Sequence, residues 1–395
     1  MEKQKLAMLV AALALGGAAL APARAAEGPV KIGVPAPLTG SYASAGTDIA
    51  NAAMIAAEDI NKKSGVLGRK IAIDTADDQC DAQIGVQAAE KLVQSGDQAI
   101  AGGYCSSAAI PESSVFHDHG LPFVADASTN PRLTEQGFAD VFRVIGRDDE
   151  QGPFAANFMK NELHAKRVAI IHDNTVYARG LAEQTRAALK KLGGVDIVYF
   201  DAITPGQSDY TSVLSVVKSD NPDVIYYTGY YSEAALIVKE ARALGVKATL
   251  MAGDANNDPT LLKVAGPAAN GLIITTAPLA QFLGGSEVQN FIKEYQSRFG
   301  HEPGPYSVYE YDAIGVTAAA MDRAKSTDPQ KVAAALHQTK DYHGITGTIS
   351  FNQQGDRENA VYITLIVKND QFTAYKALEN GHWVDVKAAS KAKAG

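Results

Sequence analysis

Long apolar runs are missing from almost the whole chain. The one exception extends from about residue 6 to residue 20, and about fifteen residues are too few for a membrane-spanning helix, which needs roughly 20. The run follows Lys3 and Lys5 and leads into small residues that include Ala25 and Ala26. This order is typical of a secretory signal peptide. We therefore predict a cleaved signal peptide over residues 1–26 and a soluble, exported mature chain; a single transmembrane anchor is the alternative interpretation.

Positive charge is in the minority. The 395 residues contain 36 Lys and Arg against 44 Asp and Glu, which gives a formal net charge of −8. The predicted signal peptide is itself basic, so the predicted mature chain is more acidic than the whole. An acidic chain lacks the basic surface that nucleic acids and anionic membranes attract. We therefore predict no nucleic-acid partner.

Cysteine is nearly absent, because the chain holds only Cys80 and Cys105. An even number of cysteines in an exported chain favours one disulfide. Closing a loop of about 25 residues would stabilise the fold by roughly 3–4 kcal/mol in the chain-entropy description. A cysteine held in a disulfide is not a nucleophile, so the pattern disfavours a catalytic Cys105.

Sequence signatures of catalysis are missing as well. The chain contains no G-x-G-x-x-G after a strand, no G-x-S-x-G and no P-loop, so the usual dinucleotide, hydrolase and nucleotide motifs are absent. His117 and His119 are a candidate metal pair, but no other His or Cys has a matching spacing, and residues two apart do not share a helical face. We predict no catalytic residue, no metal and no cofactor; an exported hydrolase is the alternative of that class.

The mature chain does contain a regular alternation of short β-rich segments and longer amphipathic ones. The first series includes "VKIGVPA", "DIANAAMIAAEDINKK", "KIAIDTADD", "DAQIGVQAAEKLVQSG" and "LPFVAD". A second series follows "FRVIGRDDEQGP" and includes "KRVAIIHD" and "GLAEQTRAALKKLGG". Such alternation predicts parallel sheets that are covered by helices on both faces. We therefore predict an α/β protein with two doubly wound parallel-sheet lobes and a break near residues 147–152.

Polar loops stand where the predicted strands end, which is where parallel α/β sheets bind ligands. The first lobe offers hydroxyls there, several of them near helix starts that favour an anion: Thr39, Ser41, Ser106, Ser107, Ser128 and Thr129. The second lobe offers rings and a carboxylate: Tyr177, Tyr230, Tyr231 and Asp254. Hydroxyls suit a carboxylate and Asp254 suits an ammonium, so the loops predict a site for a zwitterionic α-amino acid. Ordinary N-caps and half-buried tyrosines are the alternative interpretation.

Five segments carry a more specific signal: "GGYCSSAAIPES", "ADASTNPRLT", "RDDEQGP", "IHDNTVYARGLAE" and "VIYYTGYYSEA". They resemble segments of periplasmic branched-chain amino-acid-binding proteins, the Leu/Ile/Val-binding components of ABC importers. The resemblance covers essentially the whole mature chain in the same order. It implies a type I periplasmic binding protein with one disulfide, which Cys80 and Cys105 match, and a three-crossover hinge. The implied lobes are residues 27–147 plus 278–358 and residues 148–277 plus 359–395.

The resemblance also implies roles for individual residues. Ser106, which follows the second cysteine, would bind the ligand carboxylate. The carbonyl of Ala127 would accept a hydrogen bond from the ammonium, and Thr129 would contact both ends of the zwitterion. The acidic partner of the ammonium falls on Asp254. The complete expected set of ligand-binding residues is Tyr104, Ser106, Ala127, Ser128, Thr129, Tyr177, Tyr230, Asp254 and Tyr306.

Three positions depart from the pattern of that family. Asp254 stands where Glu is usual, which predicts a longer or water-bridged contact with the ammonium. Ala45 stands where the first loop usually has an aromatic residue, and Tyr42 is a candidate to replace that ring. Tyr104 stands where a residue like Leu is common. These departures leave amino-acid recognition in place and bear on the side chain that the site accepts.

The sequence thus predicts a monomeric, periplasmic solute-binding protein that is not an enzyme. It would capture a branched-chain or related amino acid between its lobes and deliver it to the membrane permease subunits of an ABC importer. Closure on the ligand would be a population shift, because the ligand contacts both lobes. The alternative function is a sensor of the same fold for an amide, an aromatic acid or an amino acid.

Overall fold

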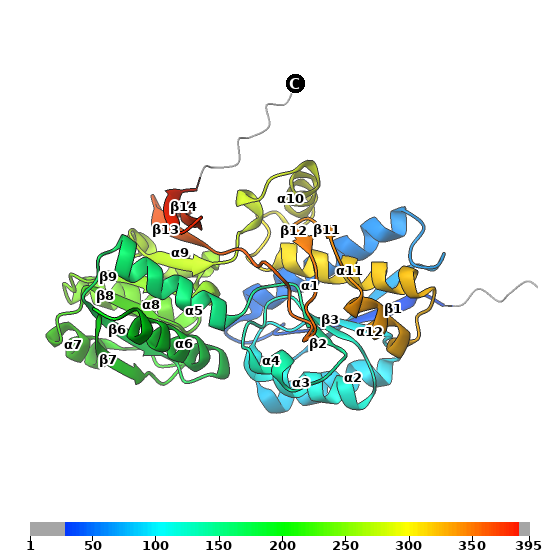
Figure 1. The fold of residues 1–395 in the computed structure, drawn as a ribbon, viewed down its shortest axis with the longest axis horizontal. Helices are drawn as coiled ribbons and strands as arrows, with labels where there is room; N and C mark the ends of the chain where they lie inside the picture. The colour runs from blue at the N-terminus through cyan, green and yellow to red at the C-terminus, as the bar shows by residue number, and fades with distance from the viewer. Residues whose placement is uncertain (1–27, 387–395) are drawn as a thin grey trace, which may run out of the picture.

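The computed structural model describes residues 28–386, so the predicted signal peptide lies outside the described residues. Two α/β lobes stand side by side, and the chain passes between them more than once (Figure 1). Among residues 28–386, no helix is both long and apolar enough to cross a membrane.

The first lobe is built on a five-stranded sheet with the order β2-β1-β3-β4-β5. Every pairing in it is parallel, which is the arrangement that alternating strands and helices predict. Its strands are β1 (Val30–Ala36), β2 (Ile71–Asp77), β3 (Ala99–Gly102), β4 (Phe123–Ala125) and β5 (Val141–Arg143).

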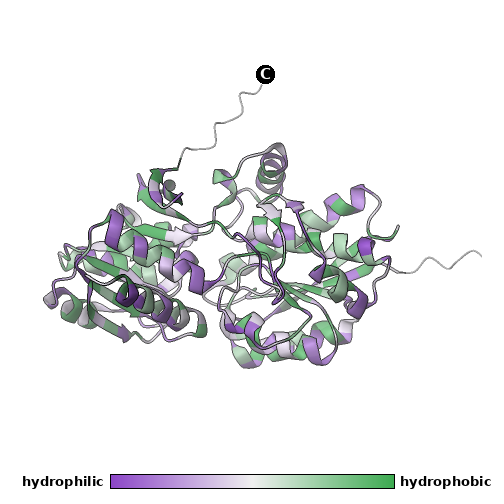
Figure 2. Ribbon diagram, viewed as in Figure 1, coloured by the Kyte–Doolittle hydropathy of each residue, from purple (hydrophilic) through white to green (hydrophobic). Residues whose placement is uncertain are grey.

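Helices cover both faces of this sheet. Successive residues of a strand point to opposite faces, and in β3 Ile100 therefore belongs to a different buried cluster from Ala99 and Ala101. The Ile100 cluster contains α2 and α3, whereas the other contains α1 and α11. Figure 2 shows apolar residues along the strands and polar ones on the outer helix faces. The helices of the first lobe are α1 (Ala43–Lys62), α2 (Ala82–Ser95), α3 (Ser106–Asp118), α4 (Arg132–Glu135), α10 (Ser286–Phe299), α11 (Ser307–Ala324) and α12 (Pro329–His337).

The second lobe is built on an eight-stranded sheet with the order β15-β14-β13-β10-β9-β8-β6-β7. Its strands are β6 (Arg167–His172), β7 (Asp196–Ala202), β8 (Val224–Tyr227), β9 (Thr249–Ala252), β10 (Ile273–Thr276), β13 (Ile363–Lys368), β14 (Gln371–Glu379) and β15 (His382–Asp385). Its helices are α5 (Asp148–Asn157), which continues as a π-helical turn (Phe158–Glu162), α6 (Val176–Leu192), α7 (Thr211–Ser219), α8 (Tyr231–Ala243) and α9 (Pro259–Ala265).

The second sheet is not wholly parallel, which differs from the prediction. β13 pairs antiparallel with β10, and β14 and β15 extend the sheet as two further antiparallel strands. Two short turns explain the antiparallel course of β14 and β15, since Asn369 and Asp370 join β13 to β14, and Asn380 and Gly381 join β14 to β15. All four residues have positive φ, which is the backbone of a type I′ turn and returns the chain directly as a hairpin.

The tail of the chain crosses back to the first lobe and then returns, as the sequence suggested. After β10, helix α11 packs against α1, α12 and β3, and the small hairpin of β11 (Tyr342–Gly344) and β12 (Gly347–Ile349) packs beside α11. The chain then enters β13 of the second sheet. Together with the passage from β5 to α5, this makes three crossovers between the lobes (Figure 1).

Two of these crossovers are tied by a buried ion-pair network. Asp356 accepts hydrogen bonds from Arg143 Nε at 2.6 Å and from Arg147 Nη1 at 2.7 Å. The Arg143 side chain is fully buried, and the Asp356 side chain is 3% exposed. The Tyr362 hydroxyl also donates to the carbonyl of Arg147 at 2.8 Å. The network therefore joins the end of β5 to the segment that leads into β13.

Candidate functional site

The loop after β3 ends in the first turn of α3. The helix begins at Ser106 itself. The carbonyl of Cys105 accepts from the N–H groups of Ala108 and Ala109, both at 2.9 Å. The earlier N–H groups of a helix have no intrahelical partner, so the start of α3 presents donors and a positive dipole end to an anion. Ser106 is 1% exposed and stands at this point.

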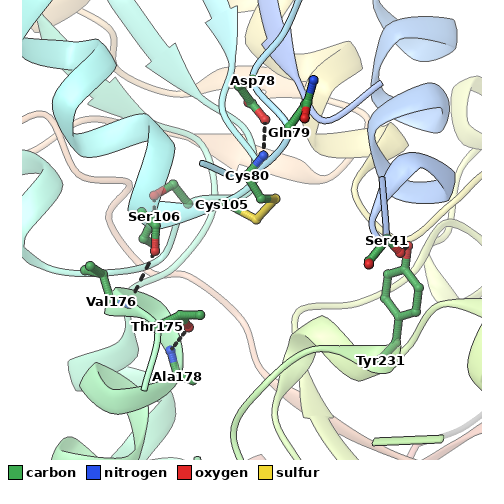
Figure 3. The surroundings of a disulfide bond; sticks show 12 residues. Ser41, Asp78, Gln79, Cys80, Cys105, Ser106, Thr175, Val176, Ala178 and Tyr231 are labelled. Atoms are coloured by element: carbon green, nitrogen blue, oxygen red, sulfur yellow. Dashed lines mark hydrogen bonds between the residues drawn. A yellow bond between two sulfur atoms is a disulfide. The ribbon is translucent and has the colours of Figure 1, made fainter. Parts of the chain in front are cut away.

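A disulfide fixes this loop. Cys80 and Cys105 are bonded, with their Cα atoms 5.2 Å apart, which confirms the predicted pairing. Asp78 accepts the N–H of Cys80 at 2.7 Å and holds the other side of the bridge. Figure 3 shows the bridge on the first lobe next to Ser106, and the start of α6 on the second lobe, where the Thr175 hydroxyl accepts from the N–H of Ala178. The disulfide thus sets the position of the residue that directly precedes Ser106.

Replacing both cysteines by Ser is expected to lower the free energy of unfolding by about 3–4 kcal/mol, the loop-closure value for a loop of about 25 residues. Ligand affinity should fall too, because the α3 start loses its covalent anchor. Urea denaturation of the oxidised wild type and the double variant measures the first effect, and reduced wild type is the control. Equal stability of the oxidised and reduced wild type would contradict the expectation.

The loop after β4 lies against Ser106. The Ser128 hydroxyl donates to Ser106 Oγ at 3.0 Å, and the N–H of Asn130 donates to the same oxygen at 3.4 Å. Ala127, Ser128 and Thr129 are all buried, at 4%, 0% and 2% exposure. Nη1 of Arg143 donates to the carbonyl of Ser128 at 3.0 Å and so helps to fix the loop after β4. The structure therefore brings the loops after β3 and β4 together at the hydroxyls of Ser106 and Ser128.

Asp254 lies on the second lobe, two residues after the end of β9. Its side chain is buried and accepts hydrogen bonds from the Tyr177 hydroxyl at 2.7 Å and from the Tyr306 hydroxyl at 3.0 Å. Burial raises the pKa of the Asp254 carboxyl, and the hydrogen bonds from these hydroxyls oppose that shift. Tyr177 comes from α6 of the second lobe, whereas Tyr306 directly precedes α11, which packs on the first lobe. A buried carboxylate held in this way is suited to a cationic group of a ligand.

Tyrosine rings form a continuous group that connects the loop before Ser106 with the surroundings of Asp254. Tyr230 lies at its centre, with ring centroids 4.6 Å from Tyr42, 5.8 Å from Tyr104 and 5.3 Å from Tyr177. The Tyr104 ring also contacts Tyr306 at 5.3 Å. The Tyr42 ring lies beside the predicted aromatic residues. This is the position it needs if it is to take the place of the aromatic residue that Ala45 lacks.

The two lobes also touch directly around the site. The Tyr231 hydroxyl donates to the carbonyl of Ser41 at 3.2 Å. The N–H of Val176 donates to Ser107 Oγ at 3.4 Å, and Asn130 Nδ2 donates to the carbonyl of Val176 at 2.9 Å. Asn130 was not among the predicted residues, because its partner belongs to the other lobe and no local pattern indicates that contact.

Two details of the sequence interpretation need correction, the start of α6 and the place of Thr39. α6 begins at Val176 and not at Gly180, because the Thr175 hydroxyl accepts the N–H of Ala178 and caps the helix there. Thr39 is exposed and donates to Asp77, so its hydroxyl is engaged at the surface and does not belong to the buried group of candidate hydroxyls. His117 pairs with Asp140 at 2.9 Å. Within residues 28–386, no group of three or more His, Cys, Asp or Glu is arranged to hold a metal ion.

A two-lobed α/β fold with a polar and aromatic site between the lobes defines a class of ligand-binding proteins. The periplasmic binding protein family model matches residues 29–371. The chain therefore belongs to the periplasmic binding protein family, whose members act outside the cytoplasm.

Curated relatives match most of the chain. A Leu/Ile/Val-binding protein homologue of Brucella suis is 32% identical over 90% of this chain and 93% of its own length. A Leu/Ile/Val-binding protein of Rhizobium johnstonii is 34% identical over 86% of this chain and 92% of its own length. An amino acid binding protein of Pseudomonas aeruginosa is 35% identical over 85% of this chain and 89% of its own length.

Solved structures are similar over the same range. A leucine-binding protein of Thermotoga maritima has a TM-score of 0.82 and 32% identity, and the match covers 87% of this chain and 97% of the other. The substrate-binding protein of a branched-chain amino-acid transporter from Streptococcus pneumoniae, in complex with isoleucine, has a TM-score of 0.82 and 25% identity over 90% of this chain and 99% of the other. These matches agree with the predicted fold of two lobes and a hinge.

Proposed function

We propose that the protein captures a branched-chain or related amino acid between its lobes and delivers it to the permease of an ABC importer. One observation supports this proposal. Ser106 at the start of α3 and the carboxyl of Asp254 are both buried, and tyrosine rings connect them, because Tyr104 contacts Tyr306, whose hydroxyl donates to Asp254. Hydroxyls and helix N–H groups suit a carboxylate, and a buried carboxylate suits an ammonium. An α-amino acid carries both groups on one carbon.

The proposed ligand contacts follow from this orientation. Ser106 would donate to the ligand carboxylate together with the first N–H groups of α3. Ala127, through its carbonyl, and Asp254 would accept from the ammonium, and the tyrosine rings would surround the side chain. The proposed set is Tyr104, Ser106, Ala127, Ser128, Thr129, Tyr177, Tyr230, Asp254 and Tyr306.

Delivery requires closure, and the proposed closure uses contacts from both lobes. The proposed lobes are residues 27–147 with 278–358 and residues 148–277 with 359–395, of which residues 27 and 387–395 lie outside the described residues. A ligand held by Ser106 on one side and Asp254 on the other favours the closed state by its differential affinity. The closed surface would then be recognised by the permease, and no chemical step is involved. We further propose export through a cleaved signal peptide at residues 1–26 and a monomeric mature protein.

A thermal-shift screen tests the proposal. The mature protein is refolded free of ligand and mixed with each of the twenty amino acids, with common amides and with aromatic acids. A ligand that binds the native state raises the melting temperature, so one or more aliphatic or related amino acids should do so. Ser106→Ala should reduce that shift. A shift with aromatic acids only, or with no compound, would contradict amino-acid capture.

A further inference from the structure

Two of the tyrosine hydroxyls at the site lack a partner. Tyr104 is 5% exposed and Tyr230 is 3% exposed. Among the described residues, nothing hydrogen-bonds to either hydroxyl, although both rings contact neighbouring tyrosines. Tyr177 and Tyr306 differ in this respect, since both of their hydroxyls donate to Asp254. The site therefore holds two phenol groups whose hydrogen-bonding capacity is unused.

An unused hydroxyl in a buried position is costly. A buried polar group without a hydrogen bond loses the interactions that water would give it. The Tyr227 hydroxyl is sealed away from any partner. The hydroxyls of Tyr104 and Tyr230 are not sealed in this way within the described structure, so an atom of the size of a water oxygen can reach them. These two hydroxyls are therefore available to a ligand.

Their place in the site indicates which part of a ligand they meet. Tyr104 lies two residues before Ser106, which is proposed to bind the ligand carboxylate. The Tyr104 ring also contacts Tyr306, whose hydroxyl donates to Asp254, the proposed partner of the ammonium. The ring of Tyr230 lies between Tyr104 and Tyr42. With both charged ends of an α-amino acid held elsewhere, the group that remains to meet these hydroxyls is the side chain.

We propose that the ligand is an amino acid whose side chain itself forms hydrogen bonds, through a hydroxyl or a carboxamide, with Tyr104 and Tyr230. This rests on the proposed capture of an amino acid, and among the branched-chain or related amino acids it selects the related ones that have a polar side chain. A purely aliphatic side chain would leave both phenols without partners in the closed site, and a site built to hydrogen-bond a ligand group discriminates strongly against an analogue that lacks the group. Tyr104 and Tyr230 are thus the residues that determine polar specificity in this chain.

Pairs of amino acids with the same shape test the inference. Thr and Val differ by a hydroxyl for a methyl, and Asn and Leu have side chains of the same branching pattern. Isothermal titration of each with wild-type protein should show Thr bound at least tenfold more tightly than Val, or Asn at least tenfold more tightly than Leu. Tyr104→Phe keeps the ring and removes the hydroxyl, and should lower the affinity for the polar member about fivefold, as loss of one neutral hydrogen bond does.

A matched variant controls for the loss of a phenol elsewhere. The Tyr311 hydroxyl donates to Asp59 at 3.1 Å on the first lobe, so Tyr311→Phe should leave all four affinities unchanged. Tighter binding of Val and Leu, with no effect of Tyr104→Phe on the ratios, would overturn the polar side chain while leaving amino-acid capture intact. If no amino acid binds the wild type, the proposed function itself fails, which is a different result.

Discussion

Replacing Asp254 by Asn is expected to weaken amino-acid binding by about 1.5–3 kcal/mol, which is roughly a 10- to 150-fold rise in Kd. Asn keeps the shape of the side chain. Tyr177 donates to Oδ1 and Tyr306 to Oδ2, so one hydroxyl keeps its acceptor in Asn and the other has to turn and accept from the amide N–H. What the substitution removes is the negative charge that would face the ligand ammonium. Isothermal titration of the tightest-binding amino acid with wild type and variant measures the loss.

The same substitution should not destabilise the ligand-free protein. Burial raises the pKa of the Asp254 carboxyl, so the folded state without ligand disfavours its ionised form, and a neutral side chain should hold the melting temperature or raise it. Asp209, an exposed carboxylate that accepts from the N–H of Thr211 at 2.9 Å, supplies the control variant Asp209→Asn, with unchanged affinity. Unchanged affinity in Asp254→Asn as well would remove Asp254 from the ammonium site.

Replacing Asp356 by Ala is expected to lower the free energy of unfolding by about 3–5 kcal/mol, the cost of leaving a buried charge without its partner. The Arg143 guanidinium is fully buried and has its ion pair with this carboxylate. Arg147 and the Thr134 hydroxyl would lose the same acceptor. Urea denaturation followed by far-ultraviolet circular dichroism measures the change.

An exposed ion pair provides the comparison. Glu58 and Arg298 form a two-pronged pair at 2.7 and 2.9 Å, but their side chains are 47% and 34% exposed. Glu58→Ala should therefore cost no more than about 1 kcal/mol. If the two variants lose similar stability, the Asp356 network is not the tie between crossovers that its burial indicates.

Much of the fold could be predicted because strand and helix periodicities are local. The parallel core strands and the long helices follow from short apolar runs between amphipathic segments. The two hairpin turns also have local sequence signals, although the predicted fold does not include them. Asn380 followed by Gly381 is a strong hairpin signal. The cap of α12 was readable too, since Asp328 accepts the N–H of Lys331 and Pro329 opens the helix.

The site was harder to predict in detail because its geometry is not local. Ser106 and Asp254 could be singled out because each follows a strand in its own lobe. Asn130 donates to Val176 of the other lobe. Asp254 accepts from the hydroxyls of Tyr177 and Tyr306, which also come from segments on different lobes. No pattern within one segment reports such pairs. The unused hydroxyls of Tyr104 and Tyr230 could not be predicted for the same reason. Whether a hydroxyl has a hydrogen-bond partner depends on all of its neighbours, and these come from several segments.

The three crossovers described above also constrain the order in which the chain can fold. The core of the first lobe includes α11, and the second sheet includes β13, which reaches Lys368. Neither lobe is therefore continuous in sequence, and neither can complete its core while the ribosome has made only the N-terminal half. Domains generally fold as units during synthesis. In a chain with interleaved lobes, both cores are completed only when almost all of the chain has been synthesised, so the nascent chain stays incompletely folded for longer.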